Sequence, residues 1–247
     1  MTGPAELLAT WEAGLAQHGP GRSLLLHRAA RPGAGTDELL SMPVGAREAD
    51  LFALRRALFG ERMQVRTECA SCGEAMEFDL DADRLAAARP PAVAGPLRVA
   101  EGEWVVEFRL PTVADVAAAG AVRDPGEARR LLVARCTVSA VRGGETVPAD
   151  RLAGLLPEHI ERRLAEAAED ADPAADVTLN VRCPECGAAN PAELDITSYL
   201  WTELDGWARD LMLDVHLLAS AYGWSEPEIL ALSPLRRRYY LELCADG

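Results

Sequence analysis

Two cysteine pairs are the residues of this 247-residue chain whose types and spacing best support a defined chemistry. Cys69 and Cys72 form a C-x-x-C pattern followed by glycine, and Cys183 and Cys186 repeat it. Such a turn places two sulfurs on one side of the backbone, and the glycine permits the left-handed conformation that turns N–H groups toward them. Because Zn²⁺ prefers four soft or borderline ligands in a tetrahedron, each pair supplies half a site. We predict that these four cysteines bind one zinc ion.

The interval between the two pairs is unusually long. Cys72 and Cys183 are separated by 110 residues, against roughly 15–20 in a compact zinc ribbon. The motif V-R-T-E-C-x-x-C-G matches V-R-C-x-x-C-G, and each is followed by an acidic strand, so we interpret the pattern as a ribbon with an inserted domain. Three alternatives stay open: two separate disulfides, which a reducing compartment disfavours; a thioredoxin-type redox pair, which would sit between a strand and a helix; and a site that has lost its metal.

No other residues assemble into an active site. Four thiolates would leave no open coordination position for water, so the zinc is expected to be structural. The four histidines lie outside any H-E-x-x-H arrangement, and nucleophile-elbow, phosphate-loop and dinucleotide-binding motifs are absent from the sequence. Cys136 and Cys244 lack a partner pattern, and Cys136 is expected to be buried as a small apolar residue. We therefore predict no catalytic residue, no cofactor other than zinc, no small-molecule substrate and no enzymatic activity.

The composition limits the possible partners and compartment. The formal net charge is -14, which disfavours nucleic acid because phosphate backbones bind through basic side chains. All 25 basic residues are arginine, which excludes catalysis through a lysine Schiff base and phosphate binding by a phosphate-loop lysine. No apolar run reaches the roughly 18–20 residues of a membrane span, and the N-terminus does not resemble a secretion signal. The expected location is the cytoplasm.

The elements that must position the cysteines are two hairpins, over residues 63–81 and 177–196. A helix over residues 46–60 precedes the first, with Leu51, Leu54 and Leu58 on one face and Gly60 as its stop. Further upstream, Thr36 is expected to cap a short helix, and the apolar run "SLLLHRAA" is interpreted as a strand.

The inserted region alternates strands and helices. It begins with a predicted linker, "LAAARPPAVAGP", and two strands joined at Glu101-Gly102. A helix capped by Thr112 and Asp115 follows, then a helix after Asp124-Pro125-Gly126, and a third that runs from "LPEHIERRL" into an acidic loop. The region is expected to form an α+β insertion.

The C-terminal region is expected to be helical. A long helix is predicted over residues 197–222. One face of it carries an apolar stripe: Leu200, Leu204, Trp207, Leu211, Val215, Leu218 and Tyr222. Ser225 and Glu228 form a capping box for a short helix, and Pro234 opens a last helix. On that last helix Leu235, Tyr239 and Leu243 form an apolar stripe.

The predicted fold is therefore α+β. It comprises a zinc-ribbon-like pair of cysteine hairpins, an inserted α/β segment and a C-terminal helical region. The boundaries are an N-terminal segment (1–47), a helix and the first hairpin (48–81), the inserted region (82–176), the second hairpin (177–196) and the C-terminal helices (197–247).

Several stretches together carry a family resemblance. In order they are "MPVGAREADLFALRRALFG", the "CASC" hairpin, "FRLPTVADVAAA", "ADPAADVTLNVRCPECG" and the long run from "LDITSYLW" to "RRRYYLEL". Over about residues 36–243 the chain resembles the baseplate hub assembly chaperone family of contractile-tailed phages, whose relatives occur in phage-tail-like contractile injection clusters.

The resemblance implies an assembly factor or structural component of a contractile-tail baseplate. It implies hub, spike or wedge proteins as partners and transfers no binding residues. The zinc prediction depends on this sequence alone. The alternative function is a zinc-ribbon regulatory or accessory protein, with association with nucleic acid left open.

Overall fold

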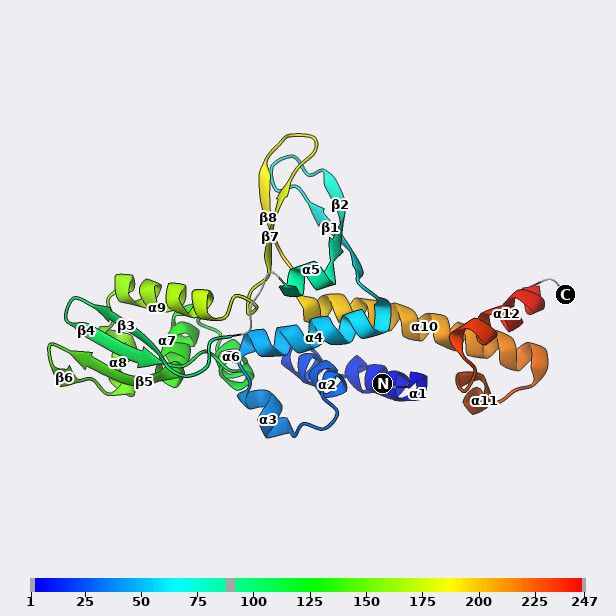
Figure 1. The fold of residues 1–247 in the computed structure, drawn as a ribbon, viewed down its shortest axis with the longest axis horizontal. Coiled ribbons are helices and arrows are strands. Elements are labelled where there is room, and N and C mark those ends of the chain that lie inside the picture. The colour runs from blue at the N-terminus through cyan, green and yellow to red at the C-terminus, as the bar shows by residue number, and fades with distance from the viewer. Residues whose placement is uncertain (1–2, 88–91, 246–247) are drawn as a thin grey trace. The chain divides into compact units, whose positions relative to one another are not determined.

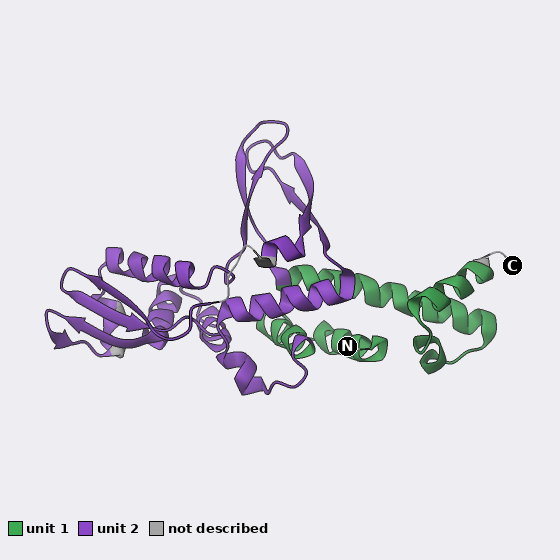
Figure 2. Ribbon diagram, in the orientation of Figure 1, with its two compact units in different colours: residues 1–29, 197–247 green, residues 30–196 purple. Residues whose placement is uncertain are grey.

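The computed structural model describes residues 3–87 and 92–245, and the chain forms two compact units (Figure 2). Unit 1 comprises residues 1–29 and 197–247, and unit 2 comprises residues 30–196. The predicted α+β class is confirmed, with cysteine-bearing hairpins and a C-terminal helical region. No helix of the described segments is long and apolar enough to cross a membrane.

Unit 1 is built from helices. They are α1 (Pro4–Leu15), α2 (Pro20–Ala30), α10 (Ile196–Tyr222), α11 (Glu226–Leu230) and α12 (Pro234–Ala245). The strand predicted for "SLLLHRAA" is wrong, because this segment lies in α2. A short apolar run does not distinguish a strand from a buried helix. Here Pro20 at the first helical position and the following leucine, alanine and arginine residues favour the helix.

Helix α10 buries the leucines of its predicted stripe and contacts the N-terminal helices α1 and α2. Leu200, Leu204, Leu211 and Leu218 are at most 2% exposed. The Trp11 indole N–H donates to Asp205 at 2.8 Å, which joins α1 to α10. The Arg22 guanidinium lies 4.1 Å from the centre of the Trp201 ring, in cation–π geometry.

The last helix is held against the end of α10 by polar and aromatic contacts. Arg237 donates to Asp214 at 3.0 Å, and the rings of Tyr222, Trp224 and Tyr240 pack together with centroids 4.7–5.7 Å apart. The apolar stripe predicted on α12 faces outward, since its members are 61–65% exposed: Leu235, Tyr239 and Leu243.

Unit 2 contains a group of leading helices, two hairpins and an inserted region with a sheet (Figure 1). The leading elements are α3 (Thr36–Ser41), α4 (Val44–Phe59), β1 (Arg62–Glu68), β2 (Ala75–Asp81) and α5 (Ala82–Ala87). Gly60 ends α4 with φ 85°, as predicted. The cap of α3 is Gly35, so the prediction for Thr36 is displaced by one residue. The predicted linker overlaps the end of α5, and residues 88–91 of it lie outside the described residues.

The inserted region contains a four-stranded antiparallel sheet, with strand order β3-β4-β5-β6, and the helices α6 to α9. Its elements are β3 (Leu97–Glu101), β4 (Trp104–Phe108), α6 (Val113–Gly120), α7 (Pro125–Cys136), β5 (Thr137–Arg142), β6 (Glu145–Thr146), α8 (Ala149–Leu155) and α9 (Glu158–Ala171). Trp104, Val106 and Phe108 of β4 form the core with Ile160 and Leu164 of α9.

Three elements of the inserted region escaped prediction: β5, β6 and α8. Strand β5 follows α7 with no turn residue between them, and Val138 and Ser139 are both exposed, so it lacks the alternation of a half-buried strand. The Gly143–Gly144 turn, with both glycines at positive φ, is the signal that could have located the β5–β6 hairpin.

The capping box predicted at Thr112 and Asp115 is confirmed at the start of α6. Asp115 is fully buried and also binds two arginines: Arg109 at 2.5 Å and Arg135 at 2.8 Å. Hydrogen bonding to Arg109, Thr112 and Arg135 outweighs the effect of burial, and the pKa of Asp115 is well below its usual range. This carboxylate therefore fixes the loop that enters α6.

Candidate metal centre

The two cysteine hairpins have the same construction. Strands β1 and β2 pair in register from Arg62 with Asp81 to Glu68 with Ala75. The second hairpin pairs β7 (Thr178–Arg182) with β8 (Ala189–Glu193). Each C-x-x-C turn lies in the loop at the end of its hairpin, and the two hairpins lie side by side (Figure 1).

The four sulfurs form one cluster. Those of Cys69, Cys72, Cys183 and Cys186 all lie within 4.8 Å of one another. Across the hairpins, Cys69 lies 3.6 Å from Cys186, and Cys72 lies 3.6 Å from Cys183. A tetrahedral ion with metal–sulfur bonds near 2.3 Å requires sulfurs about 3.8 Å apart, whereas a disulfide requires about 2.05 Å. The spacing therefore fits a tetrahedral metal, and none of the four cysteines forms a disulfide.

Backbone N–H groups support both turns in the same way. Gly73 donates to the Cys69 carbonyl at 2.8 Å, and Gly187 donates to the Cys183 carbonyl at 3.0 Å. The two glycines have φ of 75° and 72°, a conformation that favours glycine over other residues. The matching geometry explains why the glycine after each C-x-x-C is needed.

The thiols influence one another's protonation. The pKa of Cys69 is lowered to about 6, because the backbone N–H groups of Cys72 and Ser71 stabilise its thiolate. The backbone N–H of Glu74 also favours the Cys72 thiolate, but the neighbouring Cys186 and Cys69 sulfurs oppose it and raise the pKa of Cys72 to about 12. Four thiolates at this separation repel one another, so complete ionisation requires a cation among them.

Asn190 is a site residue that sequence reasoning missed. Its side chain is 4% exposed, accepts from the Ala70 N–H at 2.9 Å and donates to the Ala188 carbonyl at 2.9 Å. It thus bonds the first turn to the second hairpin beside the sulfurs. The aligned position of the first hairpin is Met76, so the repeated motif gave no signal for an amide here.

The hairpins bury few apolar side chains around the cluster. Cys69, Met76 and Cys183 form a small core, against which Val181 and Ala188 pack. The strands otherwise alternate exposed and half-buried residues. A core of this size contributes little stability, so a bound metal would be the main link between the two tips.

The remaining candidate residues lie elsewhere. Cys136 is buried, as predicted, and Cys244 is half-buried on α12. Among the side chains that the structure describes, no second group of three or more histidine, cysteine or acidic residues brings its ligand atoms together as closely.

Comparison with known proteins identifies the family. A family model described as "T4 bacteriophage base plate protein" matches residues 32–199. This range includes both cysteine pairs and ends near the start of α10, so the C-terminal helices lie beyond it. No curated protein and no solved structure is significantly similar to the chain. Because the match covers well over half of the sequence, the chain belongs to the T4 bacteriophage baseplate protein family.

Proposed function

We propose that this protein is a non-enzymatic assembly factor or structural component of a contractile-tail baseplate, and that one structural zinc joins its cysteine hairpins. The family match over residues 32–199 carries the proposal. Family membership implies partners among baseplate proteins, and the hub, spike and wedge proteins are the partners we expect. Assembly would take place in the cytoplasm.

The donor set supports a structural metal. Four sulfurs complete a tetrahedron and leave no position for a substrate or water. Tetrahedral thiolate sites select zinc or iron–sulfur centres, and zinc is the ion we propose because it has no redox chemistry of its own. Cys69, Cys72, Cys183 and Cys186 are the proposed ligands.

Outward-facing apolar side chains support a role in protein contacts. In unit 1, Met212 and Leu213 of α10 are 51% and 56% exposed, and the α12 stripe of Leu235, Tyr239 and Leu243 is exposed as well. Large exposed apolar groups that gather on one element mark interaction surfaces. The alternative of a nucleic-acid-associated regulator has no such support, given a net charge of -14.

Co-purification tests the proposal. The tagged protein, isolated from cells that produce the contractile particle, should retain a hub, spike or wedge protein that a tag-only control does not retain. Recovery of none of these proteins would refute the proposed function. Mass spectrometry of purified particles then separates the two forms of the proposal, since a structural component stays in the finished particle and an assembly factor leaves it.

A further inference from the structure

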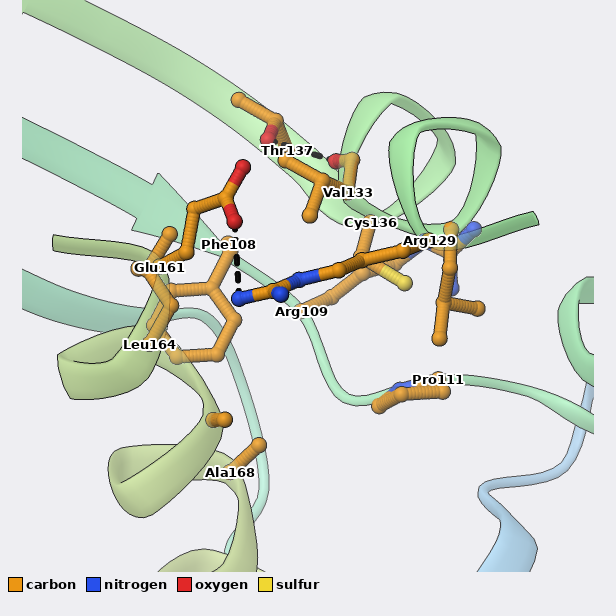
Figure 3. Close-up of a pocket in the computed structure, with 12 residues that line it drawn as sticks. Phe108, Arg109, Pro111, Arg129, Val133, Cys136, Thr137, Glu161, Leu164 and Ala168 are labelled. Carbon is orange, nitrogen blue, oxygen red and sulfur yellow. Dashed lines mark hydrogen bonds and ion pairs between the residues drawn. The ribbon is translucent and has the colours of Figure 1, made fainter. Parts of the chain in front are cut away.

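A slot lies between helices α7 and α9 of the inserted region. Its lining residues are distant in sequence from the four clustered cysteines. Its volume is about 240 Å³. Its apolar lining includes Phe108 of β4, Leu132 and Cys136 of α7, and Leu164 and Ala168 of α9. Figure 3 shows the Arg129 side chain extending across this space toward Glu161 on α9. We name this space the α7–α9 slot.

The slot is large enough for a side chain of another molecule. It exceeds the cavity of roughly 150 Å³ that accommodates benzene in a protein core, and almost all of its lining is apolar. Helix α7 is poorly covered, since Cys136 is its one fully buried residue while Leu131, Leu132 and Val133 remain half-buried. An apolar group inserted here would gain contacts that the chain itself does not supply.

The rim of the slot presents positive charge. Arg109 and Arg129, which both line it, have side chains 40% and 54% exposed. Their partners lie deeper: Asp115 is 1% exposed and is shared with Arg135, and Glu161 is 15% exposed. A guanidinium has five N–H donors, so the Arg129–Glu161 pair at 2.7 Å leaves donors on the solvent side. The arginines of this rim therefore favour an acidic ligand, although the chain as a whole has a net charge of -14.

We propose that the α7–α9 slot binds a segment of a baseplate partner that carries a large apolar side chain next to a carboxylate. The apolar side chain fills the space beneath Arg129, and the carboxylate pairs with the solvent-facing guanidinium. The identity of the partner as a baseplate protein rests on the proposed function, whereas the chemistry of the ligand rests on the lining and the rim.

The first test uses a probe with the same two features. 1-Anilinonaphthalene-8-sulfonate has an apolar ring system and an anion, and N-phenyl-1-naphthylamine is its uncharged counterpart. The full-length protein should bind the sulfonate saturably and more tightly than the neutral compound. Ala165→Leu, which adds bulk to the slot from an exposed position on α9, should weaken binding roughly tenfold or more. His159→Leu, exposed on the same helix but outside the lining, should leave it unchanged.

The rim is tested separately. Arg129→Gln should weaken sulfonate binding about two- to fivefold, as expected for one exposed charge contact, and leave the neutral probe unaffected. Arg130→Gln, at a neighbouring residue outside the lining that is 51% exposed, is the matched control. Ala168→Leu is a second slot-filling variant, and thermal melting identifies the variants that remain folded. Equal binding of the sulfonate by wild type, Ala165→Leu and Ala168→Leu would overturn the proposed slot.

The same variants distinguish this inference from the proposed function. If Ala165→Leu loses a baseplate partner that His159→Leu retains, both proposals are supported. If Ala165→Leu retains every partner, the slot is not the docking site and the baseplate function stands. If wild type binds the sulfonate in the slot but retains no baseplate protein, the baseplate function fails and the ligand chemistry of the slot stands.

Discussion

Asp172 and Gly45 show how a single side chain determines the start of a helix in unit 2. Gly45, at the second position of α4, donates its N–H to the Asp172 carboxylate at 2.9 Å. This acceptor lies 127 residues away and replaces the cap that Pro43 cannot provide. Asp172 is 3% exposed, so the contact is tightly packed.

Gly45→Ala should therefore destabilise the protein. A Cβ at this position would lie 1.9 Å from the Asp172 Oδ1 atom, so the carboxylate or the helix must move. We expect a loss of about 1–3 kcal/mol in the free energy of unfolding, measured by urea denaturation. Gly206→Ala in α10 meets no atom within 4 Å and is the control, with an expected gain of about 0.5–1 kcal/mol. Equal effects of the two substitutions would contradict this packing.

The burial of Asp172 should also make stability depend on pH. Burial raises the pKa of this carboxyl above 3.8, although the Gly45 N–H opposes the shift. The folded state therefore binds the proton more tightly than the unfolded state, and this stabilisation is present at low pH and lost as pH rises through the raised pKa. As pH falls toward 3.8, wild type should gain stability relative to Asp172→Asn. Denaturant titrations across this range that give parallel curves for the two proteins would disprove the effect.

At the scale of elements, buried acids and exposed acids at helix starts have different roles. Asp115 at α6 belongs to a capping box, and its buried carboxylate also pairs with Arg109 and Arg135, whereas Glu228 at α11 belongs to an exposed box with Ser225. The sequence pattern is the same in both helices, and only the three-dimensional surroundings distinguish them.

Asp115→Ala should cost about 1–3 kcal/mol, because it removes the cap and the buried carboxylate that two half-exposed guanidinium groups share. Glu228→Ala should cost much less, since water replaces its contacts. Chemical denaturation of both variants measures the difference. A loss for Asp115→Ala no larger than that for Glu228→Ala would show that the arginine contacts add no stability.

The elements that could be predicted from the sequence include those that begin with a capping motif or contain a C-x-x-C-G turn. Capping residues located the starts of α6, α11 and α12, and paired C-x-x-C-G motifs located both hairpins and the cysteines that meet. Strand β5 and the amide of Asn190 could not be predicted in this way. Their positions depend on contacts with β4 and with the first cysteine turn, which lie far away in the sequence.

The two hairpins are the elements that should respond most to loss of metal. Zinc binding to small thiolate sites is worth about 10–16 kcal/mol, and the hairpin tips bury only a small core. Cys183→Ser should therefore increase amide hydrogen exchange in β1, β2, β7 and β8, or yield poorly folded protein. Cys244→Ser, on α12, is the control and should leave the exchange of these strands unchanged. Unaltered exchange and melting in Cys183→Ser would remove the structural role of the site.

At the scale of the whole molecule, the two units differ in what they contain. Unit 2 contains the cysteine cluster, the inserted sheet and most of the residues that match the baseplate family, whereas unit 1 presents apolar side chains on α10 and α12. The proposed baseplate role assigns contacts with other baseplate proteins to these exposed side chains. The metal would preserve the cysteine end of unit 2 while those contacts form.

Metal analysis of the intact, never-chelated protein tests the central claim most directly. Inductively coupled plasma mass spectrometry should find about one zinc per chain, and none in a variant with Cys69 and Cys183 both replaced by serine. A wild-type protein without stoichiometric zinc, or a double variant that retains it, would contradict the claim that the two distant cysteine hairpins share one metal ion.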